Sequence, residues 1–348
     1  MSSVGSLGPL GSLGLSIASH SGLAPAAVGD VARAAEAAGF GAVFVAEGHG
    51  DALALCHPVA AATRRVRVGT AITNAALRPP VLAAKTAAQL DHAAQGRFVL
   101  GLGVGNGVMN SRFGLPPFAP RPMISEYVGV VRAVLGGSPG FDGQVYRTGA
   151  VPLDSPPVRA ALPIYLAALG PRMTALAGRI ADGVILNLMT PAQAGAAASA
   201  VRAAAAAAGR DPASVEIVCV VHCALSESVA TSSAAAAATA AAAARSVVLR
   251  YVLHPSVPVL FGEVDGGVSL DGVRELLLAG DREGAAGRVP PEVADGFVAH
   301  GDAARCAGRI AEYRAAGVDL PVVFPVPVGG DWGYGKVIRV LGDALAAS

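Results

Sequence analysis

Several residues that can transfer a proton or form a hydrogen bond directly follow short apolar runs of the sequence or lie within them. Glu47 and His49 follow AVFVA and are the strongest pair, because a carboxyl or imidazole group can donate a proton to a reacting atom. Weaker candidates are His20, Thr73, Asn74, Asn106 and Asn187. We predict that Glu47 and His49 are catalytic. The alternative for Glu47 is a structural hydrogen bond to neighbouring backbone or to a cofactor.

A second feature is the stretch GRFVLGLGVGNG, residues 96–107, with glycines at alternate positions: Gly101, Gly103, Gly105 and Gly107. The dinucleotide-binding pattern G-x-G-x-x-G requires a third glycine at position 106 or 108, where Asn106 and Val108 stand. The pattern is therefore absent. In an extended chain, alternate residues share one face, so either a bulky group lies against these glycines or the strand is closely packed there.

A candidate anion site lies in LAALGPRM. Leu169 ends an apolar run, Gly170 permits a tight turn and Pro171 suits the first position of a helix. The free backbone amides of Arg172 and Met173 would then face an anion, and the arginine adds a full charge. The alternative is an ordinary helix start with a solvated arginine.

The elements that position these residues alternate between short strands and helices, which predicts a parallel sheet with helical crossovers. The expected strands are 13–17, 42–47, 65–72, 97–105, 163–169, 183–189, 215–225 and 321–326. Eight such units without a linker favour an α/β fold with a single (β/α)8 TIM barrel over residues 1–348. An open six-stranded sheet with a second domain is the alternative.

Two segments interrupt this alternation and are predicted insertions. Residues 106–160 follow the fourth strand and include a predicted hairpin, and residues 254–300 form an irregular helical segment between strands seven and eight. In a barrel, active sites lie at the carboxyl ends of the strands. We therefore predict that residues 106–160 act as a lid, while His57, His92 and His254 are surface or packing residues.

Composition limits the possible partners. The 348 residues carry a net charge of +1, with 15% charged and 53% hydrophobic residues, so nucleic acid is an improbable partner. No Lys or Arg precedes Arg33, and the alanine-rich run 234–244 is too short to span a bilayer. We expect a cytoplasmic protein without membrane contact. CVVHC, residues 219–223, reads as a buried strand, so no metal site is expected.

Five stretches resemble the bacterial luciferase-like family, most closely its deazaflavin-dependent branch, the methylene-tetrahydromethanopterin reductase-like oxidoreductases. They are LDHAAQGRFVLGLGVG (90–105), GTAITNAALRPP (69–80), PIYLAALGPRMTALAGRIADG (163–183), EGHGDALAL (47–55) and HGDAARCAGRIAEYRAAGVDLPVV (300–323). The resemblance implies a (β/α)8 barrel that binds reduced FMN or coenzyme F420. It also implies a non-prolyl cis peptide at Ala71–Ile72, under the cofactor ring.

Combining the resemblance with the local patterns gives a set of expected cofactor-binding residues, with the phosphate at LGPRM and the ring against Gly103 and Gly105. The set is Ala46, Thr70, Ala71, Ile72, Thr73, Asn74, Gly103, Gly105, Asn106, Ala168, Leu169, Gly170, Pro171, Arg172 and Met173. The family's sugar-phosphate dehydrogenases carry histidine and glutamate where this chain has Gly48 and Asn106. Oxidation of glucose 6-phosphate is therefore disfavoured.

The predicted function is an F420H2-dependent reductase that transfers hydride to a C=C or C=N bond. Only Arg78, Arg112 and Arg121 are cations near the predicted lid, which favours a neutral, largely apolar small molecule or biosynthetic intermediate as substrate. We expect a homodimer. The alternatives are an FMNH2-dependent monooxygenase on the same scaffold and a flavin-binding barrel without catalysis.

Overall fold

The computed structural model describes residues 12–159, 161–226, 234–254 and 269–347. Its core is a ring of parallel strands: β1 (Gly14–Ala18), β2 (Ala42–Ala46), β3 (Arg67–Thr70), β5 (Phe98–Gly103), β8 (Ile164–Ala167), β9 (Gly183–Asn187), β10 (Glu216–Leu225) and β12 (Leu320–Pro325). Each pairs with its neighbour in this order, and β12 pairs with β1 to close the ring. The closed eight-stranded barrel confirms the predicted fold and excludes the open sheet.

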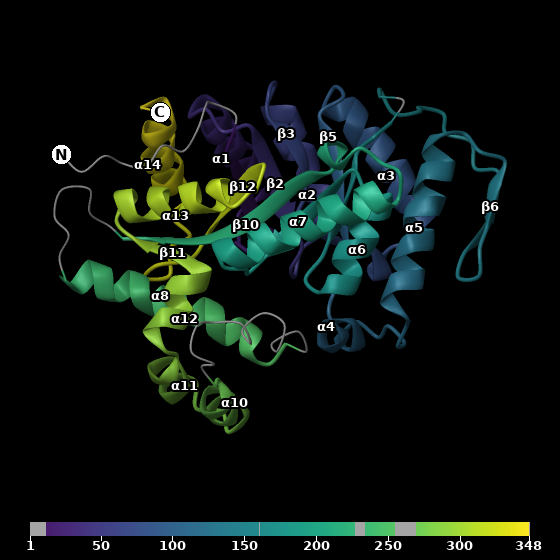
Figure 1. Ribbon diagram of the computed structural model, residues 1–348. Helices are drawn as coiled ribbons and strands as arrows, with labels where there is room; N and C mark the ends of the chain where they lie inside the picture. Colours follow the sequence, from purple (N-terminus) through teal and green to yellow (C-terminus); the bar gives the residue numbers. More distant parts are fainter. Residues whose placement is uncertain (1–11, 160, 227–233, 255–268, 348) are drawn as a thin grey trace.

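Helices surround this barrel (Figure 1). In chain order they are α1 (Pro25–Ala37), α2 (Ala52–Ala62), α3 (Pro80–Ala93), α5 (Pro120–Leu135), α6 (Pro171–Ile180), α7 (Pro191–Ala207), α13 (Ala303–Ala315) and α14 (Tyr334–Ala346). Five of them, α1, α3, α5, α6 and α7, begin at a proline. Proline is favoured there because the first helical N–H has no partner within the helix.

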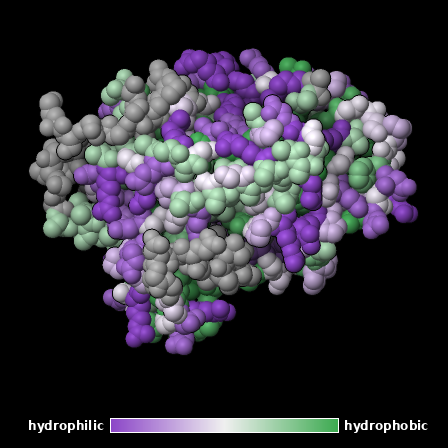
Figure 2. Space-filling model, viewed as in Figure 1, coloured by the Kyte–Doolittle hydropathy of each residue, from purple (hydrophilic) through white to green (hydrophobic). Residues whose placement is uncertain are grey.

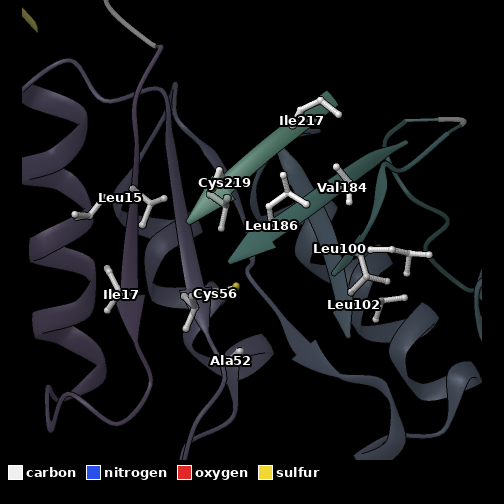
Figure 3. Packing of buried hydrophobic residues seen from close by; sticks show 14 of the residues in the cluster. Leu15, Ile17, Ala52, Cys56, Leu100, Leu102, Val184, Leu186, Ile217 and Cys219 are labelled. Atoms are coloured by element: carbon white, nitrogen blue, oxygen red, sulfur yellow. The ribbon is translucent and has the colours of Figure 1, made fainter. Parts of the chain in front are cut away.

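The core has two layers because successive side chains of a strand point to opposite sides. One set of buried side chains faces the helices, and Figure 3 shows part of it, including Leu15, Leu100, Val184 and Leu186. The other set fills the barrel interior, among them Phe44, Val99, Tyr165, Val218 and Val322. The barrel is thus a packed core rather than a channel.

A polar network closes the barrel at the amino ends of its strands. The guanidinium of Arg67, the first residue of β3, donates to both carboxylate oxygens of Glu216, the first residue of β10, at 2.6 and 2.9 Å. The hydroxyl of Tyr165 also donates to Glu216. This network lies at the amino ends of β3, β8 and β10, so the carboxyl ends are the side of the barrel that is open to a ligand.

The segment 106–160 contains α4 (Gly107–Arg112), α5 and a hairpin. The hairpin strands β6 (Gly140–Asp142) and β7 (Arg147–Gly149) pair antiparallel, as the sequence predicted. Phe141 packs against Gly129 of α5, where a Cβ would lie 2.5 Å from its ring. The hairpin therefore lies on the outer side of α5 (Figure 1), and only α4 approaches the barrel mouth.

The chain between β10 and β12 contains α8 (Ala234–Val252), α10 (Asp271–Leu278), α11 (Arg282–Arg288), α12 (Pro291–Phe297) and β11 (Val298–Gly301). Within the predicted insertion 254–300, residues 255–268 lie outside the described ranges. β11 was not predicted, and it extends the sheet by pairing with the last residues of β10. Helices α8, α11 and α12 share a separate apolar cluster beyond the carboxyl ends of the strands (Figure 1).

Three short elements complete the chain: β4 (Thr73–Asn74) and the 3-10 helices η1 (Ala75–Leu77) and η2 (Pro212–Ser214). Among the described residues, no helix combines the length and apolarity needed to cross a membrane. On the face in Figure 2, the alanine-rich α7 appears as pale, weakly hydrophobic residues with hydrophilic residues beside them.

Candidate active site

A cavity of about 630 Å³ opens at the carboxyl ends of the barrel strands. Of the predicted site residues, its wall includes Ala46, Glu47, Ala71, Ile72, Gly103, Gly105, Asn106, Leu169, Gly170 and Met173. Outside the wall lie His49, Thr70, Thr73, Asn74, Ala168, Pro171 and Arg172. The cavity therefore brings together the ends of β2, β3, β5 and β8, as the pattern of residues suggested.

The bulge behind β3 projects into this cavity. The Ala71–Ile72 peptide bond is cis, as the family resemblance implied. Backbone hydrogen bonds hold the bulge against β2: Ala71 N–H donates to Val45 O at 2.9 Å, and Glu47 N–H donates to Ile72 O at 3.1 Å. Ile72 is thereby presented at the cavity surface.

Thr70 acts behind the bulge rather than in the cavity. Its hydroxyl donates to Gly101 O at 2.7 Å and accepts from Gly101 N–H at 3.0 Å, so it bridges β3 and β5. Ala168 is also buried, and its N–H donates to Ile185 O at 3.2 Å. Both residues position the wall from outside the cavity.

The alternating glycines do not form one face of a strand, and that expectation was wrong. β5 ends at Gly103, Gly105 has a positive φ of 64°, and Gly107 begins α4. A Cβ on Gly101 would collide with the carbonyl of Thr70, while one on Gly103 would lie 2.6 Å from Cδ1 of Ile72. Gly101, Gly103 and Gly105 are thus each required for a different reason, and Gly103 makes room for Ile72.

Glu47 is half-buried at the end of β2 and anchors the bulge. Its Oε2 accepts hydrogen bonds from the hydroxyl of Thr73 and from Asn74 N–H, the latter at 3.1 Å. Burial raises the pKa of Glu47 above its ordinary value, although these two hydrogen bonds oppose the rise. The structural hydrogen bond considered as an alternative is therefore present, and the carboxyl group also lines the cavity.

Asn74 and Asn106 support the same side of the site. The Asn74 amide donates to Asn110 Oδ1 at 2.8 Å, and Asn106 Oδ1 caps α4 by accepting from Met109 N–H at 2.9 Å. A Cβ on Gly105 would lie 2.5 Å from the Asn74 amide nitrogen. These contacts fix the turn that carries Asn106 and Met109 into the wall.

His49 is exposed and lies outside the cavity wall, whereas His20 lines it. The two rings meet edge to face with centroids 5.9 Å apart, and His20 meets Trp332 in the same way at 5.3 Å. A side chain at Gly48 would overlap the His20 ring, so this glycine gives His20 its place. Of these two histidines, His20, which follows β1, is therefore the one that lines the cavity.

The start of α6 borders the cavity through Gly170 and Met173. Gly170 is the N-cap, has no side chain to cap the helix, and faces open space. Pro171 has no N–H, so the Arg172 amide is the first free donor of the helix. The Met173 amide, which was also expected to be free, donates to Gly170 O at 3.0 Å, and that part of the prediction was wrong. Pro171 and Arg172 are both exposed. The arrangement is able to accept an anion from the cavity side.

The wall opposite the Ile72 bulge is formed by residues that were not predicted as site residues, apart from Asn187. The Asn187 amide donates to Tyr251 OH at 3.1 Å, and His222 Nε2 donates to Asn187 Oδ1 at the same distance. His222 is only 3% exposed, and burial lowers its pKa to about 3, with the charge of Arg250 as a second cause. The ring is therefore neutral, and its buried Nδ1 has no partner in the described chain.

Helix α8 supplies Arg250, Tyr251 and the neighbouring His254 to this wall. His254 was predicted to be a surface or packing residue, and its position in the wall corrects that prediction. From the sequence, the cations expected near the lid were only Arg78, Arg112 and Arg121. Arg250 has to be added to the cations near the site, because it reaches the cavity from a distant part of the chain. An alanine-rich helix gives no sign in the sequence of which side chains turn toward a barrel mouth.

A closed α/β barrel with a large cavity at its carboxyl ends, bordered by a cis-peptide bulge and an uncapped helix start, is the architecture of a cofactor-dependent barrel enzyme. Family comparison is more specific. The "luciferase-like monooxygenase" family matches residues 12–320, and the chain belongs to this family. Its sequence relatives place it among the family's F420-dependent oxidoreductases.

Two curated relatives illustrate this. The chain is 32% identical over 329 residues to the Rv3520c protein of Mycobacterium tuberculosis, which is assigned to the coenzyme F420-dependent oxidoreductases, covering 89% of this chain and 94% of that protein. It is 26% identical over 327 residues to 5,10-methylenetetrahydromethanopterin reductase of Methanolobus tindarius, covering 90% of this chain and 94% of that protein.

Solved structures agree on the fold. The coenzyme F420-dependent tetrahydromethanopterin reductase of Methanopyrus kandleri matches with a TM-score of 0.83 and 24% identity, over 98% of this chain and 99% of that chain. An F420-dependent secondary alcohol dehydrogenase, solved with an F420–acetone adduct, matches with a TM-score of 0.76 and 21% identity, over 97% and 98% of the two chains.

Proposed function

We propose that this enzyme binds F420H2 in the cavity and reduces a C=C or C=N bond of a small molecule. The observation that carries the proposal is that the Ala71–Ile72 bulge and the start of α6 border one cavity of about 630 Å³. This volume lies within the range of roughly 300–1,000 Å³ that is usual for cofactor and ligand sites. The names of the relatives support the choice of F420.

The wall residues fit such a cofactor. Ile72, Gly103 and Ala71 offer an apolar surface for a flat ring, and Ala46 lies beside them. The open N-cap Gly170 and the free amide of Arg172 suit a phosphate group, whose charge the exposed Arg172 side chain would balance. Pro171, Met173 and Leu169 would hold this turn in place. When bound, reduced F420 supplies a hydride.

Glu47 is the proposed proton donor. Its Oε2 is held by Thr73 and Asn74, while Oε1 has no hydrogen-bond partner among the described residues. The raised pKa favours the protonated form, which a general acid needs. We propose that Oε1 delivers the proton to the atom that gains charge as the substrate accepts a hydride. His20 lines the same cavity and lies against Gly48, next to Glu47, and the exposed His49 would act only through it.

The remaining wall would bind the substrate and exclude water. Ile185, Val220 and Phe324 are apolar and line the cavity. Met109 of α4 covers the mouth beside Asn106, so we propose that α4 is the covering part of residues 106–160.

The test is a reduction assay with full-length protein, F420H2 and a panel of activated alkenes and cyclic imines. Oxidation of the cofactor is followed by its visible absorbance, and Glu47→Gln is compared with the unchanged protein. We expect turnover with members of the panel and a loss of at least about a hundredfold in kcat for Glu47→Gln, the usual contribution of a general acid. Unchanged turnover by Glu47→Gln would remove Glu47 from the mechanism.

A further inference from the structure

The cavity wall contains one carboxyl group and one guanidinium group that do not pair with each other. Its titratable members are Glu47, His20, His222, Arg250, Tyr251 and His254. Glu47 is the one carboxyl group among them, and its Oε2 is already engaged by Thr73 and Asn74. The charges that act on Glu47 are those of Asp51 and Arg78, so Arg250 is not its partner.

Arg250 has no ion-pair or hydrogen-bond partner among the described residues. Two other arginines, by contrast, are paired: Arg78 with Asp51 at 2.5 Å and Arg132 with Asp182 at 3.1 Å. The positive charge of Arg250 also contributes to the lowered pKa of His20 and of His222, after burial. Arg250 is solvent-exposed where it lines the cavity, and a guanidinium group there without a counter-ion attracts a carboxylate or phosphate group of a ligand.

The position of Arg250 separates it from the proposed ring site. Its electrostatic neighbours are His20, behind β1, and His222, in β10. Around the ring, β10 and β3 are separated by β12, β1 and β2 on one side and by β5, β8 and β9 on the other. The His222 side of the wall therefore lies across the barrel from the Ile72 bulge, whereas His20 lies against Gly48 at the end of β2.

From these observations we infer that Arg250 is an anion subsite for the substrate, which is a largely apolar small molecule with a carboxylate or phosphate group. The inference rests on the proposed function, because it takes the bulge side of the cavity as the cofactor side. It replaces the expectation of a neutral substrate. Arg250 anchors the charged end, and Ile185, Val220 and Phe324 contact the apolar part.

The probe is benzoate compared with benzamide, which has nearly the same shape and no charge. The only tryptophan of the chain, Trp332, reports on this wall, since its ring centroid lies 5.3 Å from His20 and 5.9 Å from Phe324. Fluorescence titrations are made with full-length protein loaded with oxidised F420. The variants are Arg250→Gln, Arg250→Lys and, as a matched control in the same helix, Arg245→Gln, which does not line the cavity.

We expect benzoate to bind more tightly than benzamide, and Arg250→Gln to weaken benzoate binding by about tenfold or more without affecting benzamide. Arg250→Lys should retain part of the preference, and Arg245→Gln all of it. Equal binding of the two probes, or an unchanged benzoate affinity in Arg250→Gln, would overturn the inference.

A second arm separates the substrate from the cofactor. The affinity of each variant is measured for F420 and for its ribityl-deazaflavin part, which lacks the phosphate-bearing tail. We expect Arg250→Gln to leave both unchanged. A loss for F420 alone would show that Arg250 binds the cofactor tail, and the substrate assignment would be wrong. Failure of the unchanged protein to bind F420 would count against the proposed function, while the benzoate–benzamide comparison on unloaded protein would still test Arg250.

Discussion

Ile72 lies directly against Gly103: a Cβ on Gly103 would stand 2.6 Å from Cδ1 and 2.8 Å from Cγ1 of Ile72. The residue behind the cis peptide and the last residue of β5 therefore form one surface. Gly103 is not simply an empty place for a ligand. It lets the Ile72 side chain lie flat at the cavity wall, where the proposed cofactor ring would rest.

This contact predicts the effect of a single methyl group. Gly103→Ala should displace the Ile72 side chain, destabilise the fold by about 1–3 kcal/mol as overpacking does, and weaken F420 binding by about tenfold. Denaturant unfolding and fluorescence titration of F420 measure the two effects.

Gly107→Ala is the matched control, since the space around Gly107 is open. The double variant Gly103→Ala with Ile72→Ala should cost less stability than the sum of the single changes, because the clash is gone. Strict additivity would show that Ile72 and Gly103 do not act on each other.

The pH dependence of turnover should report on Glu47. If its protonated form donates the proton, activity falls as the pH rises through the pKa of Glu47, which burial has raised. The Thr73 hydroxyl stabilises the carboxylate, so Thr73→Val should raise this pKa further and move the falling limb to higher pH. Profiles of kcat against pH for both proteins make the comparison.

Thr86→Val is a suitable control, because the Thr86 hydroxyl bonds only to Leu82 O within α3. It should leave the profile in place. A limb that stays fixed, or moves to lower pH, in Thr73→Val would argue that another group supplies the proton.

His222 should make the protein less stable in mild acid. Burial lowers the pKa of its imidazole from 6.5 to about 3, so below about pH 6.5 the unfolded chain binds a proton that the folded chain does not. Above that pH the ring is neutral in both states and does not lower the stability. As the pH falls toward 3, the free energy of unfolding decreases by about 1.4 kcal/mol per pH unit.

Urea unfolding at pH 7 and pH 5 measures this effect in the unchanged protein and in His222→Gln. The glutamine amide retains a hydrogen-bonding group near Asn187, and the other histidines titrate equally in both proteins. The unchanged protein should lose about 2 kcal/mol more than the variant between these pH values. Equal losses would mean that the fold does not lower the pKa of this ring.

The sequence predicted the barrel because its signal is local. Apolar runs such as those that became β2 and β10 are continuous, and helices such as α6 and α7 begin at prolines, so each unit is visible within about 30 residues. Strand ends were less accurate: β5 stops at Gly103 because Gly105 turns with a positive φ. β11 was missed because its four residues run directly into the N-cap Asp302 of α13.

Of the cavity wall, mainly the side formed by the ends of β2, β3, β5 and β8 was predicted from the sequence. Residues at strand ends, such as Glu47 and Asn106, are placed by the barrel itself, and both line the cavity. Arg250 and Tyr251 come from α8, whose approach depends on packing against α12 and β11, and no local pattern records that. His222 was noted only as part of a buried strand. Its partner Asn187 was identified, but the pairing of the two needs the register of β9 and β10.

The central claim is that this barrel uses F420, and direct binding tests it most simply. The purified full-length chain is titrated separately with F420 and with FMN, and each reduced form is then tested for oxidation by the protein with and without oxygen. We predict tight binding of F420 and slow reaction of F420H2 with oxygen. Tight binding of FMN, no binding of F420 and rapid oxygen consumption with FMNH2 would contradict the account and favour a monooxygenase.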